Sequence, residues 1–390
     1  MRINIYPIVS QLHEKKRINY ETQLLLNELM NVSNHEIKLV EIEELYNADL
    51  SLILIQSGGS EQSFLANINR LKPPFYLLTY GYNNSLAASL EILSYLKDNN
   101  FDGEVLHGDT NYLVERINNL LINKKGLKYG LIGKPSDWLI ASNVNYQLAA
   151  KIHNVELIDI DIKELIDVYQ NINFDENIDA NEFNFDHDEL VASFKLKTAL
   201  EIIKDKYQLN GLTIRCFDLL DSIKTTACLA LGIFNQQKCV STCEGDIPAM
   251  ISMHVLNQVC GQPGFQANPI RINIKEKKMV LAHCTLPIDM AKTYQLDTHF
   301  ESGIGVAIKG ELLEEKITIF KLSRNLTDYF VTTGKIIRNL KEDNLCRTQI
   351  EVEIDNNIEY FLNRPYGNHH IIIYGDHQQE IVNYMGLLLK

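Results

Sequence analysis

The sequence predicts an α/β fold in which two Rossmann-like domains with parallel sheets precede a C-terminal, mostly antiparallel, β-barrel-like domain. Three observations support this prediction. Over residues 1–125, short apolar runs alternate with amphipathic helical patterns, which is typical of a parallel sheet covered by helices. The same alternation resumes at residue 126 and continues to about residue 262. From residue 263 onward the apolar residues alternate with period two, which indicates antiparallel strands.

The first predicted domain, residues 1–125, contains strands that read as nearly continuous apolar runs. Helices on both faces of a sheet explain such runs, because neither face is then left to solvent. The predicted strands are Ile3–Val9, Ile37–Ile42, Leu50–Gln56, Phe75–Tyr80 and Gly103–Leu106. Apolar residues at three- and four-residue intervals predict helices over Tyr20–Met30, Ser85–Lys97 and Asn111–Ile122.

The second predicted domain, residues 126–262, follows a polar junction at residues 123–128 and repeats the parallel pattern. Its predicted strands are Tyr129–Ile132, Val155–Ile160, Gly211–Phe217 and Lys238–Thr242. Its predicted helices are Asn143–His153, Asp188–Tyr207, Lys224–Phe234 and Pro248–Cys260.

The third predicted domain, residues 263–390, shows the two-residue alternation of half-buried strands. The predicted strands are Arg271–Ile274, Met279–His283, Gly305–Ile308, Lys316–Leu322, Asp328–Lys335, Thr348–Ile354 and His370–Tyr374.

Composition excludes several classes of partner. Among the 390 residues, 37 Lys and Arg face 50 Asp and Glu, so the net charge is −13 and no overall field attracts nucleic acid or an anionic membrane. The start of the chain lacks the features of a signal peptide, and no run of ~18 apolar residues occurs. The 7 cysteines never form a C-x-x-C pair, which favours reduced thiols. We therefore expect a cytoplasmic protein.

The densest polar cluster is Thr242-Cys243-Glu244-Gly245-Asp246-Ile247-Pro248, between a predicted strand and a predicted helix. Ligands of open α/β sheets bind at the carboxyl ends of strands, so two acids there are well placed for a site. Asp246 is also a good helix N-cap, with a proline in the first turn behind it. Capping does not require Glu244, which makes Glu244 the stronger functional candidate.

Two further patterns suggest ligand binding. Six of the 11 histidines lie after residue 250, and imidazoles near carboxylates suggest a site for manganese or a similar divalent cation. The loop Gly133–Trp138 follows a predicted strand and holds the single tryptophan. An exposed Trp138 offers a stacking surface for a sugar, whereas a buried one belongs to the core; both interpretations stay open.

Five motifs in order resemble the L-fucose isomerase / L-arabinose isomerase family, and most closely its shorter, fucose isomerase-related members. The motifs are Gly133–Ser142, Cys243–Asp246, Leu281–Thr285, Gly303–Gly310, and Gly367–His370 with Tyr374–Asp376. The resemblance implies two Rossmann-like domains, a β-barrel-like domain and a homotrimer or homohexamer. It also implies a manganese-dependent intramolecular oxidoreductase that interconverts an aldose and a ketose through an enediolate.

Carried over residue by residue, the resemblance assigns the site. Glu244 falls on the first metal-ligand glutamate and is the expected proton shuttle. Asp246, or an acid that the sequence does not identify, is expected to replace the missing second acid. The late histidine ligand falls on His369 or His370, and an extra histidine ligand falls on His283. Asn268 stands where the family has its second acidic ligand. Substrate contacts are expected from Ser136, Asp137, Trp138 and Asn368.

Asn268 is a departure from the family pattern, because an amide oxygen can ligate a cation weakly but cannot accept a proton. Two alternatives follow. In the first, the chain is a carbohydrate-binding or regulatory homologue with lost or altered activity. In the second, it catalyses another enediol reaction such as epimerisation. The sequence does not identify the sugar.

Overall fold

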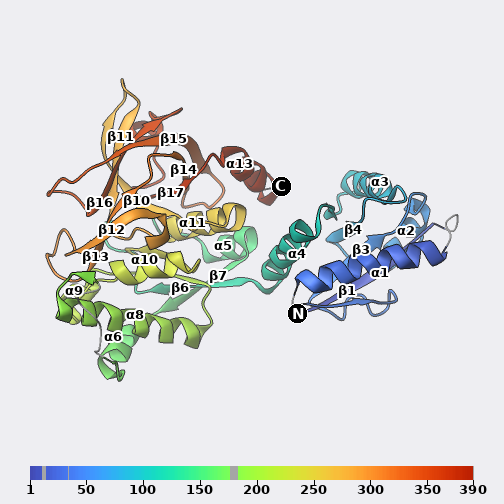
Figure 1. The fold of residues 1–390 in the computed structure, drawn as a ribbon, viewed down its shortest axis with the longest axis horizontal. Coiled ribbons are helices and arrows are strands. Elements are labelled where there is room, and N and C mark those ends of the chain that lie inside the picture. Colours follow the sequence, from blue (N-terminus) through green and yellow to red (C-terminus); the bar gives the residue numbers. More distant parts are fainter. Residues whose placement is uncertain (11–14, 34, 176–182, 390) are drawn as a thin grey trace. The chain divides into compact units, whose positions relative to one another are not determined.

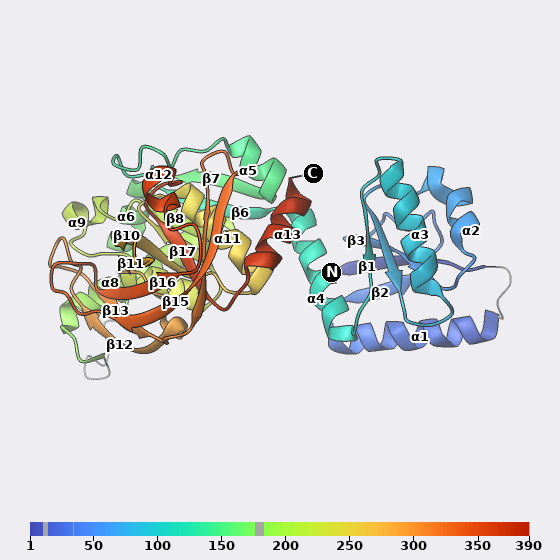
Figure 2. The same cartoon turned by 90° about the horizontal axis from the view of Figure 1, so that it is seen from above.

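The computed structural model describes residues 1–10, 15–33, 35–175 and 183–389. The chain forms two compact units, Met1–Lys125 and Gly126–Lys390, which are described separately below (Figures 1 and 2).

The first unit is built on a five-stranded parallel sheet with the strand order β2-β1-β3-β4-β5. The strands are β1 (Arg2–Ile8), β2 (Glu36–Leu39), β3 (Leu50–Ile55), β4 (Phe75–Thr79) and β5 (Gly103–Leu106). The helices are α1 (Lys15–Val32), α2 (Glu61–Asn67), the short η1 (Ile68–Arg70), α3 (Ser85–Asp98) and α4 (Thr110–Lys125).

Helices cover both faces of this sheet. On one face, α1 and α4 bury residues such as Leu29 and Ile117 against Ile5 of β1. On the other face, α2 and α3 bury Phe64 and Ile92 in a second core with Leu77 of β4 and other strand residues. Two separate cores on one sheet explain why its strands are apolar almost throughout.

The second unit begins with a four-stranded parallel sheet of order β7-β6-β8-β9. The strands are β6 (Leu127–Ile132), β7 (Val155–Ile160), β8 (Gly211–Ile214) and β9 (Val240–Cys243). The helices of this part are α5 (Tyr146–His153), α6 (Ile162–Asn171), α8 (His187–Tyr207), α9 (Asp218–Ser222), α10 (Cys228–Gln236) and α11 (Ile247–Cys260).

The same unit ends in a closed antiparallel barrel of order β10-β11-β16-β15-β14-β17, with a two-stranded sheet β12-β13 beside it. The strands are β10 (Phe265–Asn273), β11 (Lys278–His283), β12 (Ala291–Asp297), β13 (Ala307–Leu312), β14 (Lys316–Leu322), β15 (Tyr329–Asn339), β16 (Thr348–Ile354) and β17 (His370–Tyr374). The remaining helices are η2 (Ile288–Met290), α12 (Tyr360–Asn363) and α13 (Gln378–Leu388).

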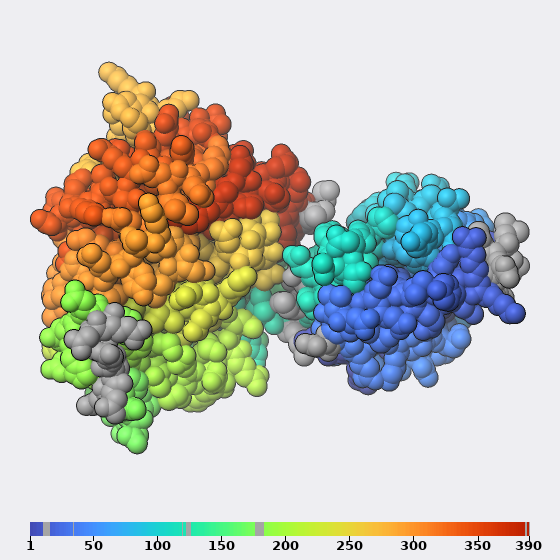
Figure 3. Space-filling view, viewed as in Figure 1, coloured from blue at the N-terminus to red at the C-terminus, as the bar shows by residue number. Residues whose placement is uncertain are grey.

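Helix α11 joins the parallel sheet to the barrel. Every side chain from Ile247 to Leu256 is buried, because α11 packs on β6 and β9 on one side and on β14 and β17 on the other. Figure 1 shows α11 in yellow between the green sheet region and the orange and red barrel, and Figure 3 shows these segments directly against one another. The carboxyl end of β9 is thereby held beside the barrel.

The predicted fold class, parallel α/β sheets followed by an antiparallel barrel, is confirmed. The boundary that we predicted at residues 262 and 263 within the second unit stays a prediction. Strand β10 is longer than predicted and contains Pro269, which lies where its register with β11 shifts. The sequence-based prediction omitted β12, whose residues are largely exposed and show no apolar alternation.

In the described part of the chain, no helix combines the length and apolar character that crossing a bilayer requires. All seven cysteines are free thiols, and four of them are buried.

Candidate metal centre and active site

The turn between β9 and α11 carries the two acids that the sequence singled out. Glu244 and Gly245 both have left-handed backbone conformations, with φ of 64° and 71°. A Cβ at residue 245 would lie 2.8 Å from the Lys134 carbonyl oxygen, so only glycine fits there. The amide of Ser136 also donates to the Glu244 carbonyl oxygen at 2.9 Å. The loop after β6 therefore packs against this turn and fixes the direction of the Glu244 side chain.

Glu244 meets two histidines from the barrel. Its Oε1 lies 3.5 Å from Nε2 of His369 and 4.0 Å from Nε2 of His283. The two imidazole rings are 5.3 Å apart and nearly perpendicular. One ligand atom from each of the three residues lies within 4.8 Å of the others, and all three residues are buried. We call this set the Glu244 group; among the described residues it is the only such group of three or more histidine, cysteine or acidic side chains.

Each histidine of the Glu244 group has one ring nitrogen engaged by protein and the other directed at the group. Nδ1 of His369 bonds Oδ2 of Asp246 at 2.9 Å, and its buried Nε2 has no hydrogen-bond partner in the structure. Nδ1 of His283 bonds the Thr285 hydroxyl at 3.0 Å. Metal-binding histidines typically donate their other ring nitrogen in this way. The unpartnered Nε2 of His369 and the mixed oxygen and nitrogen donors fit a divalent cation such as manganese.

The charges of the Glu244 group favour an ionised carboxylate. Burial alone would raise the pKa of Glu244, but the close contact and charge of His369, with help from His283 and Trp138, lower it to about 2. Burial would lower the pKa of His369, whereas its contacts with Asp246 and Glu244 raise it to about 9. Burial and the charge of His369 lower the pKa of His283 to about 4.

Asp246 serves two purposes in the structure. Its Oδ1 accepts the amide of Ala249 at 2.8 Å, which confirms the predicted N-cap of α11. Its Oδ2 bonds His369, and Nζ of the buried Lys321 lies 3.3 and 3.4 Å from its two oxygens. Burial would raise the pKa of Asp246, but Lys321 and His369 hold it well below its usual range. Asp246 is 1% exposed, and it contacts the side of the His369 ring that faces away from Glu244.

Asn268, Asn368 and His370 lie around this centre. The Asn368 side-chain amide donates to Oδ1 of Asn268 at 3.0 Å. His370 lies outside the Glu244 group, because its Nδ1 bonds the Asn368 carbonyl oxygen at 3.0 Å and its Nε2 bonds the Tyr360 hydroxyl at 3.1 Å. Burial lowers the pKa of His370 to about 3. The ligand roles predicted for Asn268 and His370 stay predictions.

The predicted substrate-binding loop brings Trp138 to Glu244. The indole Nε1–H donates to Oε2 of Glu244 at 2.6 Å, yet 53% of the tryptophan is exposed. The core interpretation of Trp138 is therefore wrong: the ring is anchored at one end by its N–H and exposed on its surface. Asp137 instead forms a two-pronged ion pair with Arg215, at 3.0 and 2.9 Å. Ser136 is buried, and its hydroxyl has no partner in the structure.

A cavity of about 1010 Å³ lies at the ends of β6 and β7. Ser136, Asp137 and Arg215 line this cavity, but the three members of the Glu244 group do not. The loop 133–138 therefore separates the cavity from the Glu244 group.

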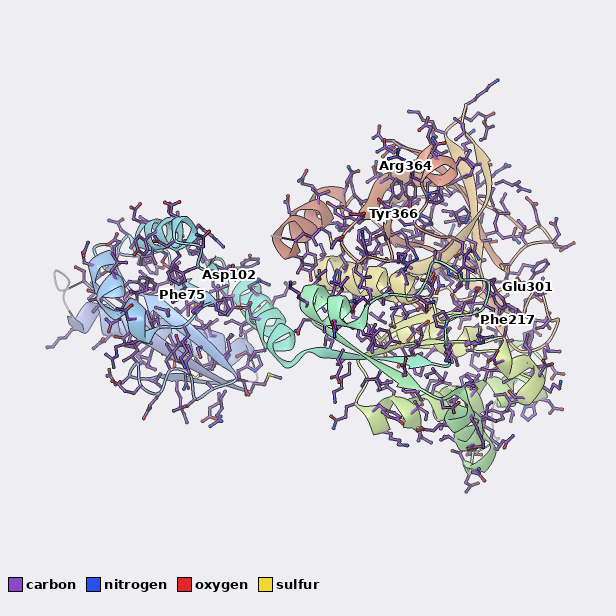
Figure 4. All side chains as sticks on the ribbon, turned by 180° about the vertical axis from the view of Figure 1, so that it is seen from behind. Phe75, Asp102, Phe217, Glu301, Arg364 and Tyr366 are labelled. Carbon is purple, nitrogen blue, oxygen red and sulfur yellow. The ribbon has the colours of Figure 1, made fainter. Side chains whose placement is uncertain are left out.

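Sequence reasoning missed an aromatic and acidic wall beside Trp138. Phe217 meets Trp138 edge-on at 4.9 Å and His299 edge-on at 5.5 Å. Nε2 of His299 lies 3.0 Å from a carboxylate oxygen of Glu301, whose side chain is 47% exposed. Figure 4 shows Phe217 and Glu301 close together on one side of the second unit. No spacing in the sequence links these residues to Glu244, because Phe217 precedes α9 whereas His299 and Glu301 lie in the connection between β12 and β13.

Sequence reasoning also missed Lys321. In the strand Lys316–Leu322, residues two apart share a face, so Lys321 lies on the same face as Ile317 and Ile319. A lysine on that apolar face was the available signal.

Comparison with protein-family models finds no match. The chain is 24% identical over 220 residues to the sulfoquinovose isomerase of Priestia aryabhattai, covering 52% of this chain and 48% of that protein. It is 25% identical over 187 residues to the sulfoquinovose isomerase of Clostridium sp. (strain MSTE9), covering 45% and 41% of the two chains. It is 22% identical over 183 residues to the sulfoquinovose isomerase of Alkalicoccus urumqiensis, covering 44% of this chain and 41% of that protein.

Each of these relatives carries the name sulfoquinovose isomerase. The similarity agrees with the sugar-isomerase part of the sequence-based prediction. The chain spans about half the length of the curated relatives it matches.

Proposed function

We propose that this chain is an aldose–ketose isomerase that uses a divalent cation, with Glu244, His283 and His369 as the cation ligands. The observation that carries the proposal is the convergence of three buried ligand atoms: Oε1 of Glu244 lies 3.5 Å from Nε2 of His369 and 4.0 Å from Nε2 of His283. The Nδ1 atoms of both histidines have protein partners, which leaves the two Nε2 atoms facing the carboxylate. The named relatives support the choice of a sugar as substrate.

The chemistry that a cation held by these three residues supplies is polarisation of a sugar carbonyl, which makes the neighbouring C–H more acidic. Manganese suits the mixed donor set, and the Asn268 amide oxygen is a further candidate donor. We propose His369 rather than His370 as the late histidine ligand, because both ring nitrogens of His370 already have protein partners.

The protein's own groups then position the sugar and move the proton. Trp138 offers its exposed ring to an apolar sugar face, while its N–H holds Glu244 in place. A pKa of about 2 keeps Glu244 ionised, as a cation ligand must be, but makes it a weak proton acceptor at neutral pH. We therefore assign proton transfer between C1 and C2 to Glu301, the half-exposed carboxylate that His299 holds on the wall beside Trp138 and Phe217.

A panel assay tests this proposal. The protein is incubated with MnCl₂ and with C5, C6 and deoxy aldoses, as well as sulfoquinovose, and ketose formation is measured. We expect turnover of at least one sugar, and a loss of ~10²-fold or more in Glu244→Gln. Glu276→Gln, a change at an exposed acid in the turn before β11, is the matched control and should keep full activity. No turnover of any sugar, or full activity in Glu244→Gln, would contradict the proposal.

A second candidate function, sugar binding without turnover, is favoured by the Asn268–Asn368 hydrogen bond. That bond gives Asn268 a structural partner at the position where the resembled family has an acidic ligand. Sugars of the panel that bind, as measured by calorimetry, but give no ketose would support this second function. The predicted cytoplasmic location and homotrimeric or homohexameric assembly stay predictions.

A further inference from the structure

A fully buried lysine lies directly behind the candidate metal centre. The side chain of Lys321 is 1% exposed, and its ammonium pairs with the Asp246 carboxylate. Removing a lysine ammonium from water is costly unless an opposite charge and hydrogen bonds compensate it. Asp246, also 1% exposed, provides that compensation with both of its carboxylate oxygens, at 3.3 and 3.4 Å.

We infer that Lys321 is a positioning residue for the metal centre: it fixes the Asp246 carboxylate, which in turn aims Nε2 of His369 at the Glu244 group. This inference rests on the proposed function, because it assigns a role toward the cation of that same site.

The geometry of Asp246 explains why capping alone does not account for Lys321. An N-cap needs one side-chain oxygen, and Oδ1 already accepts the Ala249 amide at 2.8 Å. The other oxygen, Oδ2, bonds Nδ1 of His369 at 2.9 Å. The ammonium of Lys321 contacts both oxygens and so resists rotation of the carboxylate away from His369.

The backbone of Lys321 is itself fixed relative to α11. The amide of Leu322 donates to the Ser252 hydroxyl at 2.8 Å, and that hydroxyl donates to the Pro248 carbonyl oxygen at 2.6 Å. Strand β14 thus hydrogen-bonds to the helix that Asp246 caps. A rigid support of this kind keeps the ligand geometry precise to a fraction of an ångström.

The turn that carries His369 runs over the end of the same lysine. A Cβ at Gly367 would lie 3.8 Å from Cε of Lys321, so this stretch of backbone passes close to the lysine side chain. Lys321 therefore supports His369 through Asp246, and the turn at Gly367 that leads to His369 passes beside the same lysine.

The inference is tested by measuring Mn²⁺ binding to Lys321→Met with electron paramagnetic resonance. Carboxylates behind metal-binding histidines typically contribute 10–100-fold to metal affinity, and we expect a loss of this size. The matched control is Lys316→Met on the same strand, whose ammonium pairs with Asp355 at the surface and should leave Mn²⁺ affinity unchanged.

A double variant separates this role from a purely structural one. Lys321→Met leaves the Asp246 charge buried and unpaired, so the single variant is also less stable. In Lys321→Met/Asp246→Asn both charges are gone and the asparagine still caps α11, so we expect thermal stability to recover while Mn²⁺ affinity stays reduced.

The Mn²⁺ affinities distinguish failure of this inference from failure of the proposed function. Wild-type Mn²⁺ affinity in either folded variant overturns the inference and leaves the proposed function standing. Absence of Mn²⁺ binding in the unmodified protein instead overturns the proposed function and, with it, the role of Lys321. If Lys321→Met does not fold, Lys321→Gln, which keeps an N–H donor toward Asp246 but no charge, is measured in its place, and wild-type Mn²⁺ affinity again overturns the inference.

Discussion

Nδ1 of His369 is bonded to Oδ2 of Asp246 at 2.9 Å, in a site where both residues are buried. This bond places the Asp246 carboxylate directly behind the His369 imidazole, and the predicted role of Asp246 as a catalytic acid stays a prediction. The same carboxylate caps α11, so one side chain couples the start of a helix to the orientation of an imidazole from the barrel.

Asp246→Asn should weaken Mn²⁺ binding by about 10–100-fold, because the neutral amide holds the His369 imidazole less firmly. Asparagine and aspartate cap helices about equally well, so α11 should keep its N-terminus. Calorimetric Mn²⁺ titration measures the affinity, and circular dichroism checks the helix content. Unchanged affinity would show that His369 does not depend on this carboxylate.

Asn268→Asp should strengthen Mn²⁺ binding if residue 268 takes part in the site, since a carboxylate is a better ligand for this cation than an amide. The hydrogen bond from Asn368 can persist, because the new carboxylate still accepts it. Asn273→Asp, at the far end of the same strand, is the control. Equal affinity in Asn268→Asp and the unmodified protein would place the additional ligand elsewhere.

Glu301→Gln should lower kcat by ~10²–10⁴-fold with little change in KM, if Glu301 transfers the proton. The amide keeps the size of the side chain and can still contact His299, but it cannot carry a proton. Steady-state kinetics on the best sugar of the panel measure both constants. A rise in KM at constant kcat would instead assign Glu301 to substrate binding.

The free energy of unfolding should decrease as the pH is lowered, because of the buried His254. Its Nδ1 bonds the Tyr129 hydroxyl at 2.8 Å. Burial, aided by the charge of His153, lowers its pKa from 6.5 to about 3. Between these values the unfolded chain binds a proton that the folded protein excludes, so this contribution is complete above pH 6.5 and lost toward pH 3. One group with this shift costs ~2 kcal/mol at pH 5.

Urea unfolding at pH 7.5 and pH 5 measures this effect. The unfolding free energy of both proteins is expected to decrease from pH 7.5 to pH 5. In His254→Gln this decrease should be ~2 kcal/mol smaller than in the unmodified protein. The exposed His187, replaced by glutamine, is the control and should not alter the difference. An identical pH dependence in His254→Gln and the unmodified protein would contradict this explanation.

Most of the fold could be predicted from the sequence, because the patterns that indicate strands and helices are local. Apolar runs and helical periodicity mark the strands and helices of the parallel sheets, and the change to period two marks the barrel. Strand β10 was predicted too short because Pro269 interrupts its pattern, and the irregular register there depends on the partner strand. The exposed β12 has no pattern that distinguishes it from a loop.

The site was less predictable, because its geometry arises from contacts between distant segments. Glu244, His283 and His369 could be named from motifs, but which of His369 and His370 faces Glu244 depends on the start of β17. The pairing of Asp246 with Lys321 requires α11 to pack on β14, which no local pattern reveals. Phe217 meets His299, and so the neighbouring Glu301, only in the folded chain.

The most direct test of the central claim is anomalous X-ray diffraction at the manganese edge from crystals grown with MnCl₂. We predict one strong anomalous peak enclosed by Glu244, His283 and His369, which is absent in crystals of Glu244→Gln. No peak at this position in the unmodified protein, or a peak only at surface carboxylates, would contradict the assignment of these residues as a metal centre.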